Sequence, residues 1–178
     1  MRTVTYGAAC SLDGFITGPG ASIDWLHWSD DAQAIMAAYW KTVDTILMGR
    51  KTWEFAAAQG GEPADVPEGA PRSYVFSRTL ELIDRPGVTL VKTDPAAFVR
   101  ELKGRPGGDI CVLGGSDLAR SLIAAGVVDE VGCNIHPVLL GSGVPLFVDC
   151  GRRVSLELKE CRAIDGGCVY ATYRVKVE

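Results

Sequence analysis

The chain has 178 residues, 47% of them hydrophobic and 22% charged, which is typical of one globular domain with a substantial core. Its net charge of −4 provides no overall basic field for nucleic acid or an anionic membrane, so a bound anion must be held by a local group of cations. No apolar run approaches the roughly 20 residues of a membrane helix, and the N-terminus does not have the pattern of a signal peptide.

Strands and helices alternate along most of the chain. Short apolar runs such as TILMG and DICVLGG are typical of strands buried on both faces. We expect strands at about 2–10, 44–49, 72–77, 87–92, 109–114, 128–137, 154–163 and 168–177, and helices at about 30–42, 50–58, 94–103 and 115–125. This order predicts a parallel sheet covered by helices on both faces, in one domain spanning residues 1–178.

The C-terminal end departs from this order. The segments LELKECRAI and CVYATYRVKV alternate between apolar and polar residues, as half-buried strands do. Asp165, Gly166 and Gly167 between them favour a tight turn. We therefore predict an α/β fold of three layers, αβα, in which an antiparallel hairpin is added to a mostly parallel sheet.

Two stretches show no clear element. Residues 59–71 are rich in glycine and proline and are expected to form a surface excursion. Residues 17–29 combine a Gly-Pro-Gly run with Trp25 and Trp28. Aromatic side chains in a loop indicate either a lid or pocket wall, or simply a packed loop.

The six cysteines form no CxxC pair, and the chain has two histidines. This arrangement gives no ligand spacing for zinc. We expect free, buried thiols in a reducing cytoplasm, and no bound metal.

The stretch ILMGRKTWE, residues 46–54, carries the clearest functional signal. Its apolar run stops at Gly49, and Arg50, Lys51 and Thr52 follow on the expected first turn of a helix. Unpaired N–H groups and the positive end of the helix dipole face outward there, and added cations suit a phosphate group. The alternative is an ordinary helix start at the surface.

Two further strand ends carry similar residues. The segment SRT at residues 77–79 follows one apolar run, and the segment GGSD at residues 114–117 follows another. Ligands of an open parallel sheet bind beyond the carboxyl ends of its strands, so we expect these segments at one rim with residues 49–52. Glycine lets the backbone approach a pyrophosphate, and Arg50 and Arg78 can pair with phosphate oxygens. The GxGxxG fingerprint of a Rossmann site is absent from the sequence.

These segments resemble those of a known superfamily. MGRKTWE, VFSR and VLGG look like the NADPH-binding segments of dihydrofolate reductase. AACSLDGFI, LIAAGVVDEV and IHPVLLGSG are more similar to the reductase domain of the bifunctional riboflavin-biosynthesis deaminase/reductase and to its small stand-alone bacterial relatives. The resemblance covers nearly the whole chain and implies a dihydrofolate reductase-like fold.

The resemblance also implies which residues bind NADPH. Ser77 and Arg78 would contact the 2′-phosphate, which favours NADPH over NADH, and Ala9 and Ile16 would flank the nicotinamide. For Ile16 a plain core position is the alternative. The full set of implied cofactor residues is Ala9, Ile16, Gly49, Arg50, Lys51, Thr52, Ser77, Arg78, Gly114, Gly115, Ser116, Asp117 and Leu118.

The substrate side is expected near Trp25 and the helix that follows it. Dihydrofolate reductases place a carboxylate at the start of the first helix. Counting forward from Trp25 gives Asp30, whereas counting back from Gly49 gives Gln33. Asp30 or Asp31 would then donate the proton, directly or through water. Alternatively, both are favourable charges at a helix N-terminus.

Two more residues are assigned to the substrate side. Asp13 is expected either to face the substrate or to fix its own loop, since an aspartate before glycine is a common turn residue. Trp25 is expected to stack on a flat heterocycle, with core packing as the alternative.

Together these features predict an NADPH-dependent oxidoreductase acting on a pyrimidine or pterin-like compound, with a ribosylaminopyrimidine of the riboflavin pathway as the specific candidate. The zinc signature of a deaminase is absent from the sequence. The alternatives are a dihydrofolate reductase and a non-catalytic NADPH-binding protein. The expected partner is a small heterocyclic substrate rather than nucleic acid or a membrane, and the resemblance suggests a cytoplasmic homodimer.

Overall fold

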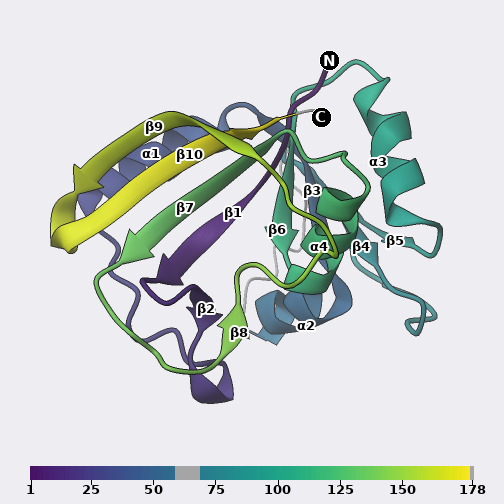
Figure 1. The fold of residues 1–178 in the computed structure, drawn as a ribbon. Coiled ribbons are helices and arrows are strands. Elements are labelled where there is room, and N and C mark those ends of the chain that lie inside the picture. Colours follow the sequence, from purple (N-terminus) through teal and green to yellow (C-terminus); the bar gives the residue numbers. More distant parts are fainter. Residues whose placement is uncertain (59–68, 177–178) are drawn as a thin grey trace.

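The computed structural model describes residues 1–58 and 69–176, and a sheet of eight strands forms the centre of this part of the chain (Figure 1). From one edge to the other the strands are β5 (Val88–Val91), β4 (Arg72–Phe76), β3 (Val43–Gly49), β6 (Asp109–Gly114), β1 (Val4–Ser11), β7 (Glu130–His136), β10 (Cys168–Val175) and β9 (Leu156–Ile164). In this order, the strands from β5 to β7 run parallel to one another, and β10 pairs antiparallel with both β7 and β9.

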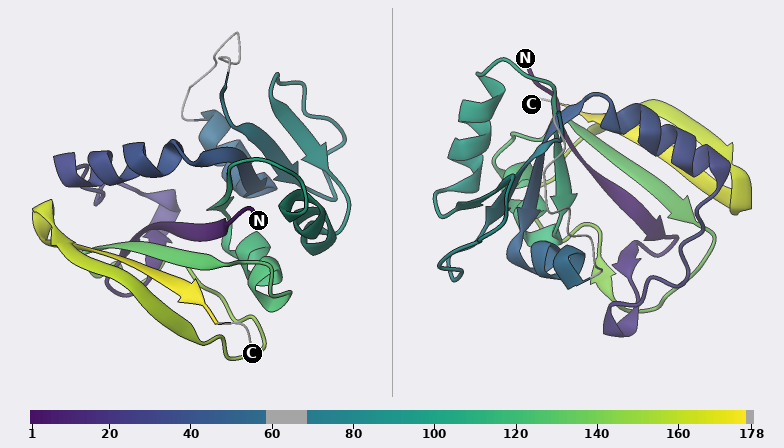
Figure 2. Two further views of the ribbon diagram at one scale, coloured as in Figure 1. Left: turned by 90° about the horizontal axis from the view of Figure 1, so that it is seen from above. Right: turned by 180° about the vertical axis from the view of Figure 1, so that it is seen from behind.

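Helices cover both faces of this sheet (Figure 2). They are α1 (Asp30–Trp40), α2 (Arg50–Ala58), α3 (Pro95–Lys103) and α4 (Ser116–Ala124). Connections between parallel strands are right-handed, which puts α1 and α2 on one face and α3 and α4 on the other. Side-chain caps define two of the starts, because Ser29 accepts from the N–H of Ala32 and Asp94 from that of Ala97.

The main core lies between the sheet and the α3–α4 layer. Leu47, Val112, Val99 and Leu122 are among its fully buried side chains. The opposite face is packed differently, since α1 buries only Ala32, in a small cluster with two residues of the C-terminal hairpin. The middle of the sheet beneath α1 is therefore not filled by a second core of this size.

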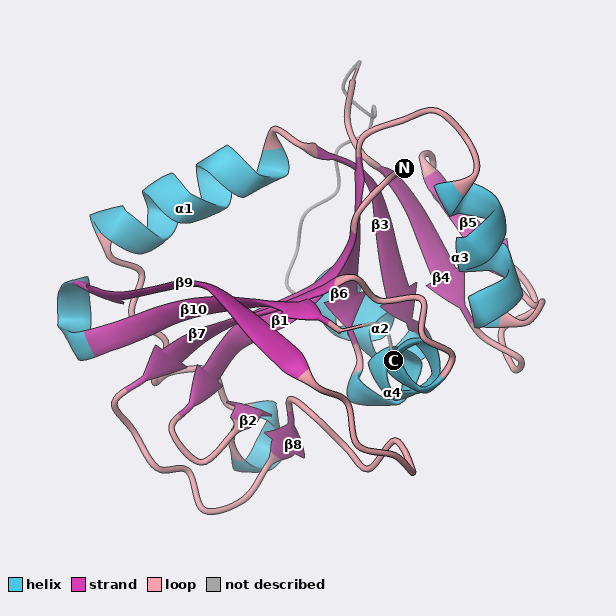
Figure 3. Ribbon diagram, turned by 45° about the horizontal axis from the view of Figure 1, so that its top comes forward, coloured by secondary structure: helices cyan, strands magenta, loops and turns pink. Residues whose placement is uncertain are grey.

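The predicted α/β fold is confirmed, with every expected strand and helix present in the described residues and bounds that shift by a few residues. The C-terminal hairpin is also confirmed, and a short 3₁₀ turn, Asp165–Gly167, joins its strands. Two strands were not predicted: β2 (Phe15–Thr17) and β8 (Val144–Pro145) form a small antiparallel sheet beside the large one (Figure 3). They are too short to give a sequence pattern. Residues 59–68 of the expected surface excursion lie outside the described residues.

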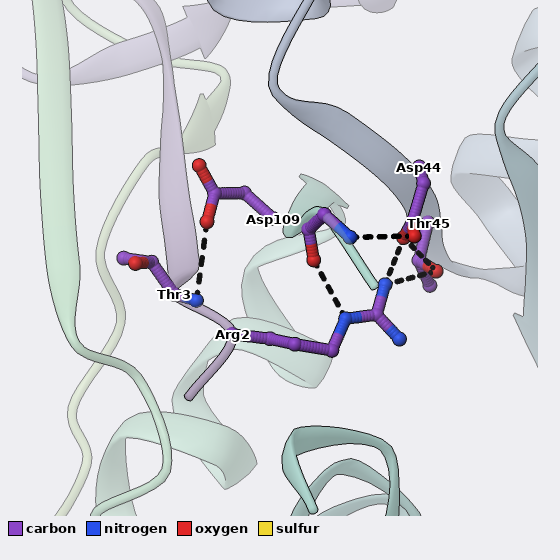
Figure 4. A network of polar contacts seen from close by, with 6 residues as sticks. Arg2, Thr3, Asp44, Thr45 and Asp109 are labelled. Carbon is purple, nitrogen blue, oxygen red and sulfur yellow. Dashed lines mark hydrogen bonds and ion pairs between the residues drawn. The ribbon is translucent and has the colours of Figure 1, made fainter. Parts of the chain in front are cut away.

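The rim at the amino ends of β1, β3 and β6 is tied together by one arginine (Figure 4). Arg2 is 8% exposed, and its Nε donates to the carbonyl of Gly108 at 2.6 Å. Its Nη2 pairs with Asp44 and donates to Thr45 Oγ1 at 2.7 Å. Asp44 in turn accepts from the N–H of Gly108 at 2.7 Å. These contacts fix the starts of three strands, at the end of the sheet remote from the predicted phosphate site.

The expectation of buried thiols is correct for half of the cysteines. Cys10, Cys111 and Cys168 are buried, whereas Cys161 is exposed. Cys161 lies on β9, an edge strand whose side chains are almost all exposed. Within residues 1–58 and 69–176, no helix is both long and apolar enough to span a membrane.

Candidate functional site

A cavity of about 1470 Å³ lies along the carboxyl ends of the parallel strands. It is lined by the end of β3 and the start of α2, by the residues after β4 and β5, and by the turn from β6 into α4. It continues across β1, β7 and β10 beneath α1. The three segments predicted to share one rim of the sheet do so, because their strands are parallel neighbours.

The junction of β3 and α2 forms one wall of the cavity. Gly49 ends the strand, and α2 begins at the next residue, so Arg50, Lys51 and Thr52 occupy the first helical turn and line the cavity. Arg50 Nη1 pairs with the carboxylate of Glu54, one turn along, at 2.7 Å. Both side chains are about half exposed, so this pair contributes little stability, and the guanidinium remains accessible to a stronger anion.

The turn from β6 into α4 faces that junction across the cavity. The Gly114–Gly115 peptide bond is cis, and the φ of Gly114 is +148°, a conformation that favours glycine. A Cβ at either glycine would lie within 3.3 Å of Thr52 Oγ1. A side chain at either position would press on the Thr52 side chain, and at Gly114 the backbone conformation itself also favours glycine.

Helix α4 begins without a side-chain cap. Its cap residue is Gly115, and Ser116 Oγ donates instead to the carbonyl of Pro145. The first-turn N–H groups of Ser116, Asp117 and Leu118 thus lack a side-chain acceptor, and all three residues line the cavity. Such a helix start attracts an anion.

The segment after β4 adds a third polar wall. Ser77 Oγ accepts from the N–H groups of Thr79 and Leu80, at 3.2 and 3.0 Å, which shapes a turn around Arg78. Arg78 is exposed and lines the cavity, as does Lys92 after β5. This end of the cavity therefore combines cations from three segments with two helix starts.

The other half of the cavity, beneath α1, is apolar and aromatic. Its upper wall is one face of α1, with the spacing of successive helical turns. In the floor, β1 and β7 approach each other closely at Gly7 and Gly132, where a Cβ at Gly7 would lie 2.2 Å from the Gly132 carbonyl oxygen. The wall residues of α1 are Ala32, Ile35, Met36, Tyr39 and Trp40.

Few polar groups face this half. Burial raises the pKa of the Tyr39 hydroxyl above its usual value and raises that of the Cys111 thiol to about 11, so both stay protonated at neutral pH. Thr17 Oγ1 and Asn134 Oδ1 are buried and have no hydrogen-bond partner among the described residues. Both residues line the cavity. A buried polar atom without a partner is costly, so a ligand that donated a hydrogen bond to either atom would relieve that cost.

Every residue that the sequence implied for the cofactor lines this cavity. The loop at residues 17–29 does form part of its wall, through Thr17, Ala21, Ile23, Leu26 and Trp28.

The residues predicted for catalysis and substrate binding lie elsewhere, and none of Asp13, Trp25, Asp30 and Asp31 lines the cavity. Asp30 and Asp31 are exposed at the start of α1. The carboxylate of Asp31 accepts from the N–H of Asp165 in the hairpin turn at 3.1 Å. Both carboxylates therefore lie outside the cavity lining, because α1 turns its apolar face toward the cavity, and a catalytic role for either residue stays a prediction.

Asp13 fixes its own loop, which is one of the two roles expected from the sequence. Its carboxylate accepts from the N–H groups of Leu140 and Gly141, at 3.1 and 2.8 Å, and so ties its turn to the loop after β7. A hydrogen bond from Ser11, supported by these N–H groups, lowers the pKa of Asp13.

Trp25 packs edge-on against His136, with ring centroids 5.2 Å apart, and its Nε1 donates to the carbonyl of Ser22 at 3.3 Å. Trp25 thus packs on the same face of β7 as Asn134 but is not among the residues that line the cavity.

Sequence reasoning missed Asn134, Thr5 and Thr172 on the floor of the cavity. The available signal was the alternation of Gly132, Asn134 and His136 along β7, which puts two small or polar residues and a histidine on one face of an otherwise apolar strand.

Sequence and structure comparisons show which known proteins this chain is similar to. The model of the RibD C-terminal domain family matches residues 2–170. The chain belongs to that family. The Bacillus subtilis (strain 168) uncharacterized protein YyaP is 34% identical over 181 residues, which cover 97% of this chain and 95% of YyaP.

Solved structures of RibD-type and dihydrofolate reductase proteins share the fold. A protein provisionally named for riboflavin biosynthesis, from Shewanella sp. PV-4, superposes with a TM-score of 0.86 at 24% identity and covers 99% of this chain and 100% of its own. The bifunctional deaminase/reductase of Thermotoga maritima gives 0.72 at 19% identity, covering 98% of this chain and 57% of its own. Enterococcus faecalis dihydrofolate reductase, solved with NADP(H), gives 0.70 at 18% identity, covering 98% and 97%. The fold is thus dihydrofolate reductase-like.

Proposed function

We propose that this protein is an NADPH-dependent reductase that delivers a hydride to a pyrimidine or pterin-like heterocycle. The observation that carries the proposal is the two-part cavity, with a cationic end at two helix starts and an apolar, aromatic end beneath α1. Its volume of about 1470 Å³ exceeds the roughly 300–1,000 Å³ of a pocket for one small molecule, so it has room for a dinucleotide and an acceptor together.

The residues present fit the nucleotide. The glycine cradle formed by Gly114 and Gly115 against Thr52 would be filled by any Cβ, and it brings backbone N–H groups to the rim where a pyrophosphate would lie. Arg78 and Ser77 would hold the 2′-phosphate, because a guanidinium pairs with phosphate oxygens in two parallel hydrogen bonds. When bound, NADPH would supply the hydride.

The protein side of the chemistry is positioning and exclusion of water. Ala9 and Ile16 would flank the nicotinamide, and the α1 wall would press the acceptor ring against the floor of β1 and β7. Asp94 and Asp117, the carboxylates of the described cavity lining, belong to segments at the cationic end. We therefore propose that water, rather than a carboxylate, delivers the proton to the acceptor.

Membership of the RibD C-terminal domain family supports a substrate of the riboflavin-pathway type, with a ribosylaminopyrimidine as the specific candidate. A dihydrofolate reductase is less well supported, because the described lining beneath α1 has no carboxylate to bind a pterin ring. A cytoplasmic setting, where thiols stay reduced, is part of the same proposal.

The test is the loss of NADPH absorbance when purified protein is mixed with a panel of acceptors. We expect turnover with 5-amino-6-(5-phosphoribosylamino)uracil and little with NADH in place of NADPH. Turnover with dihydrofolate alone would instead identify a dihydrofolate reductase. Tight NADPH binding without turnover on any acceptor would identify a non-catalytic nucleotide-binding protein.

A further inference from the structure

Asn134 lies at the centre of the cavity floor beneath α1. In the register of the sheet it is directly opposite Ala9 on β1 and Tyr170 on β10. Residues opposite each other on neighbouring strands point to the same face, and all three line the cavity. Asn134 therefore sits beside the strand that is expected to flank the nicotinamide, where an acceptor ring would lie.

The two ends of the Asn134 amide have different surroundings. Its Nδ2 lies 3.4 Å from His136 Nε2, whereas its buried Oδ1 has no partner among the described residues. A buried amide oxygen of this kind costs free energy until a donor reaches it. The atom thus favours a ligand that brings an N–H group to this point of the floor.

The contacts of the neighbouring His136 favour one orientation of the Asn134 amide. The Cys168 thiol points to the carbonyl of Gly166, at 4.0 Å, and its sulfur lies 3.4 Å from His136 Nδ1, an arrangement that suits a proton on Nδ1. With its proton on Nδ1, the imidazole presents Nε2 as an acceptor, and only the NH₂ end of Asn134 can donate to it.

Burial supports this assignment. His136 is 2% exposed, and Trp25 covers its ring. Burial first, and then the neighbouring His27, lowers the pKa of His136, so the ring is neutral at neutral pH. Burial also raises the pKa of Cys168, so its thiol keeps the proton that it donates.

We propose that Asn134 Oδ1 accepts a hydrogen bond from an amino or ring N–H group of the acceptor heterocycle, and that His136 is the positioning residue that holds the amide in this orientation. The inference rests on the function proposed above and narrows its substrate class. An aminopyrimidine would bind well, and a ring that presents only oxygen acceptors at this point would leave two acceptors facing each other and bind poorly.

The experiment measures the affinity of two pyrimidines for NADPH-saturated protein, by quenching of tryptophan fluorescence at a pH where both are neutral. The probes are 2,4-diaminopyrimidine, which has N–H donors, and 2,4-dimethoxypyrimidine, which has the same ring and none. We expect the wild-type protein to prefer the diamino probe about tenfold, the ratio that one net hydrogen bond supplies. Asn134→Leu should bring the ratio close to one, and Asn134→Ala serves as a second variant with no added bulk.

The positioning role has its own readout. His136→Leu should reduce the preference, because the amide can then turn, and His136→Gln should restore it, since a glutamine oxygen can accept from Nδ2. Cys161→Ser, a change at an exposed residue of β9 that does not line the cavity, is the control and should keep the wild-type ratio. Thermal unfolding followed by circular dichroism checks that each variant is folded.

A wild-type preference that persists in both Asn134 variants would overturn the assignment of Asn134 while leaving the proposed function intact. Equal ratios for His136→Leu and His136→Gln would overturn the positioning role. Wild-type protein that binds neither NADPH nor the diamino probe would overturn the proposed function, and this inference with it.

Discussion

Single residues at the cationic end differ in how freely they can meet a phosphate. Arg50 already pairs with Glu54, whereas Arg78 has no ion-pair partner among the described residues and is held by the turn that Ser77 organises. Arg78 is therefore the residue on which a preference for the 2′-phosphate should depend most.

We predict that Arg78→Ala weakens NADPH binding by about tenfold or more and changes NADH binding much less, because a charged hydrogen bond to phosphate contributes roughly 1.5–3 kcal/mol. Titration calorimetry with both nucleotides measures this. Arg72→Ala is the matched control, since Arg72 is an exposed arginine at the other end of the same strand and should leave both affinities unchanged. Equal losses for NADPH and NADH would contradict the assignment of Arg78.

Residue chemistry in the sequence was sufficient to find the cationic end but not the acceptor end. Gly49, Arg50 and Arg78 could be located because each follows an apolar run that ends at the same rim. Asp30 and Asp31 could not be placed, since sequence spacing does not tell which side of a helix start meets a ligand. Asn134 escaped notice because the alternation along β7 shows which residues share a face, but not that this face lines a cavity, which depends on its neighbours across the sheet.

At the scale of elements, α1 and α4 have opposite relations to the sheet. Helix α4 buries Leu118, Ala119 and Leu122 in the main core, whereas the inner face of α1 lines the cavity. The long elements could be predicted because both kinds of helix carry apolar faces. Their difference in packing could not, since a face that meets a ligand and one that meets a core have the same spacing.

This difference predicts a contrast between two substitutions. Leu122→Ala should lower the free energy of unfolding by about 2–5 kcal/mol, because Leu122 is fully buried and leaves a void. Met36→Ala should cost about 1 kcal/mol or less but weaken acceptor binding, because the side chain lines the cavity. Urea unfolding and acceptor titration measure the two effects. A large stability loss for Met36→Ala would show that α1 packs as part of the core.

At the scale of the whole molecule, the β9–β10 edge of the sheet leaves apolar side chains exposed on one face. The face away from α1 carries Val169, Leu156 and Leu158 there, which are 36%, 42% and 55% exposed. Helix α4 contacts β3 and β6, and α3 packs against α4, so both helices lie away from this edge (Figure 2). We propose that this apolar surface of the hairpin is the contact of the expected homodimer, since exposed patches of this kind mark protein interfaces.

We predict that the wild-type protein sediments as a dimer in analytical ultracentrifugation and that Leu158→Glu shifts it to a monomer with little loss of NADPH affinity. Glu157→Lys, a charge change on the neighbouring residue, whose side chain points to the other face of the strand, is the control. A wild-type protein that remains monomeric at high concentration would refute this contact.

The thin packing beneath α1 has a thermodynamic consequence for the molecule. One face of the sheet is packed by the chain itself, whereas the face beneath α1 would be filled by the cofactor and acceptor that we propose to bind there. The melting temperature of the protein should then rise with ligand concentration, because a ligand that binds only the folded form raises the free energy of unfolding.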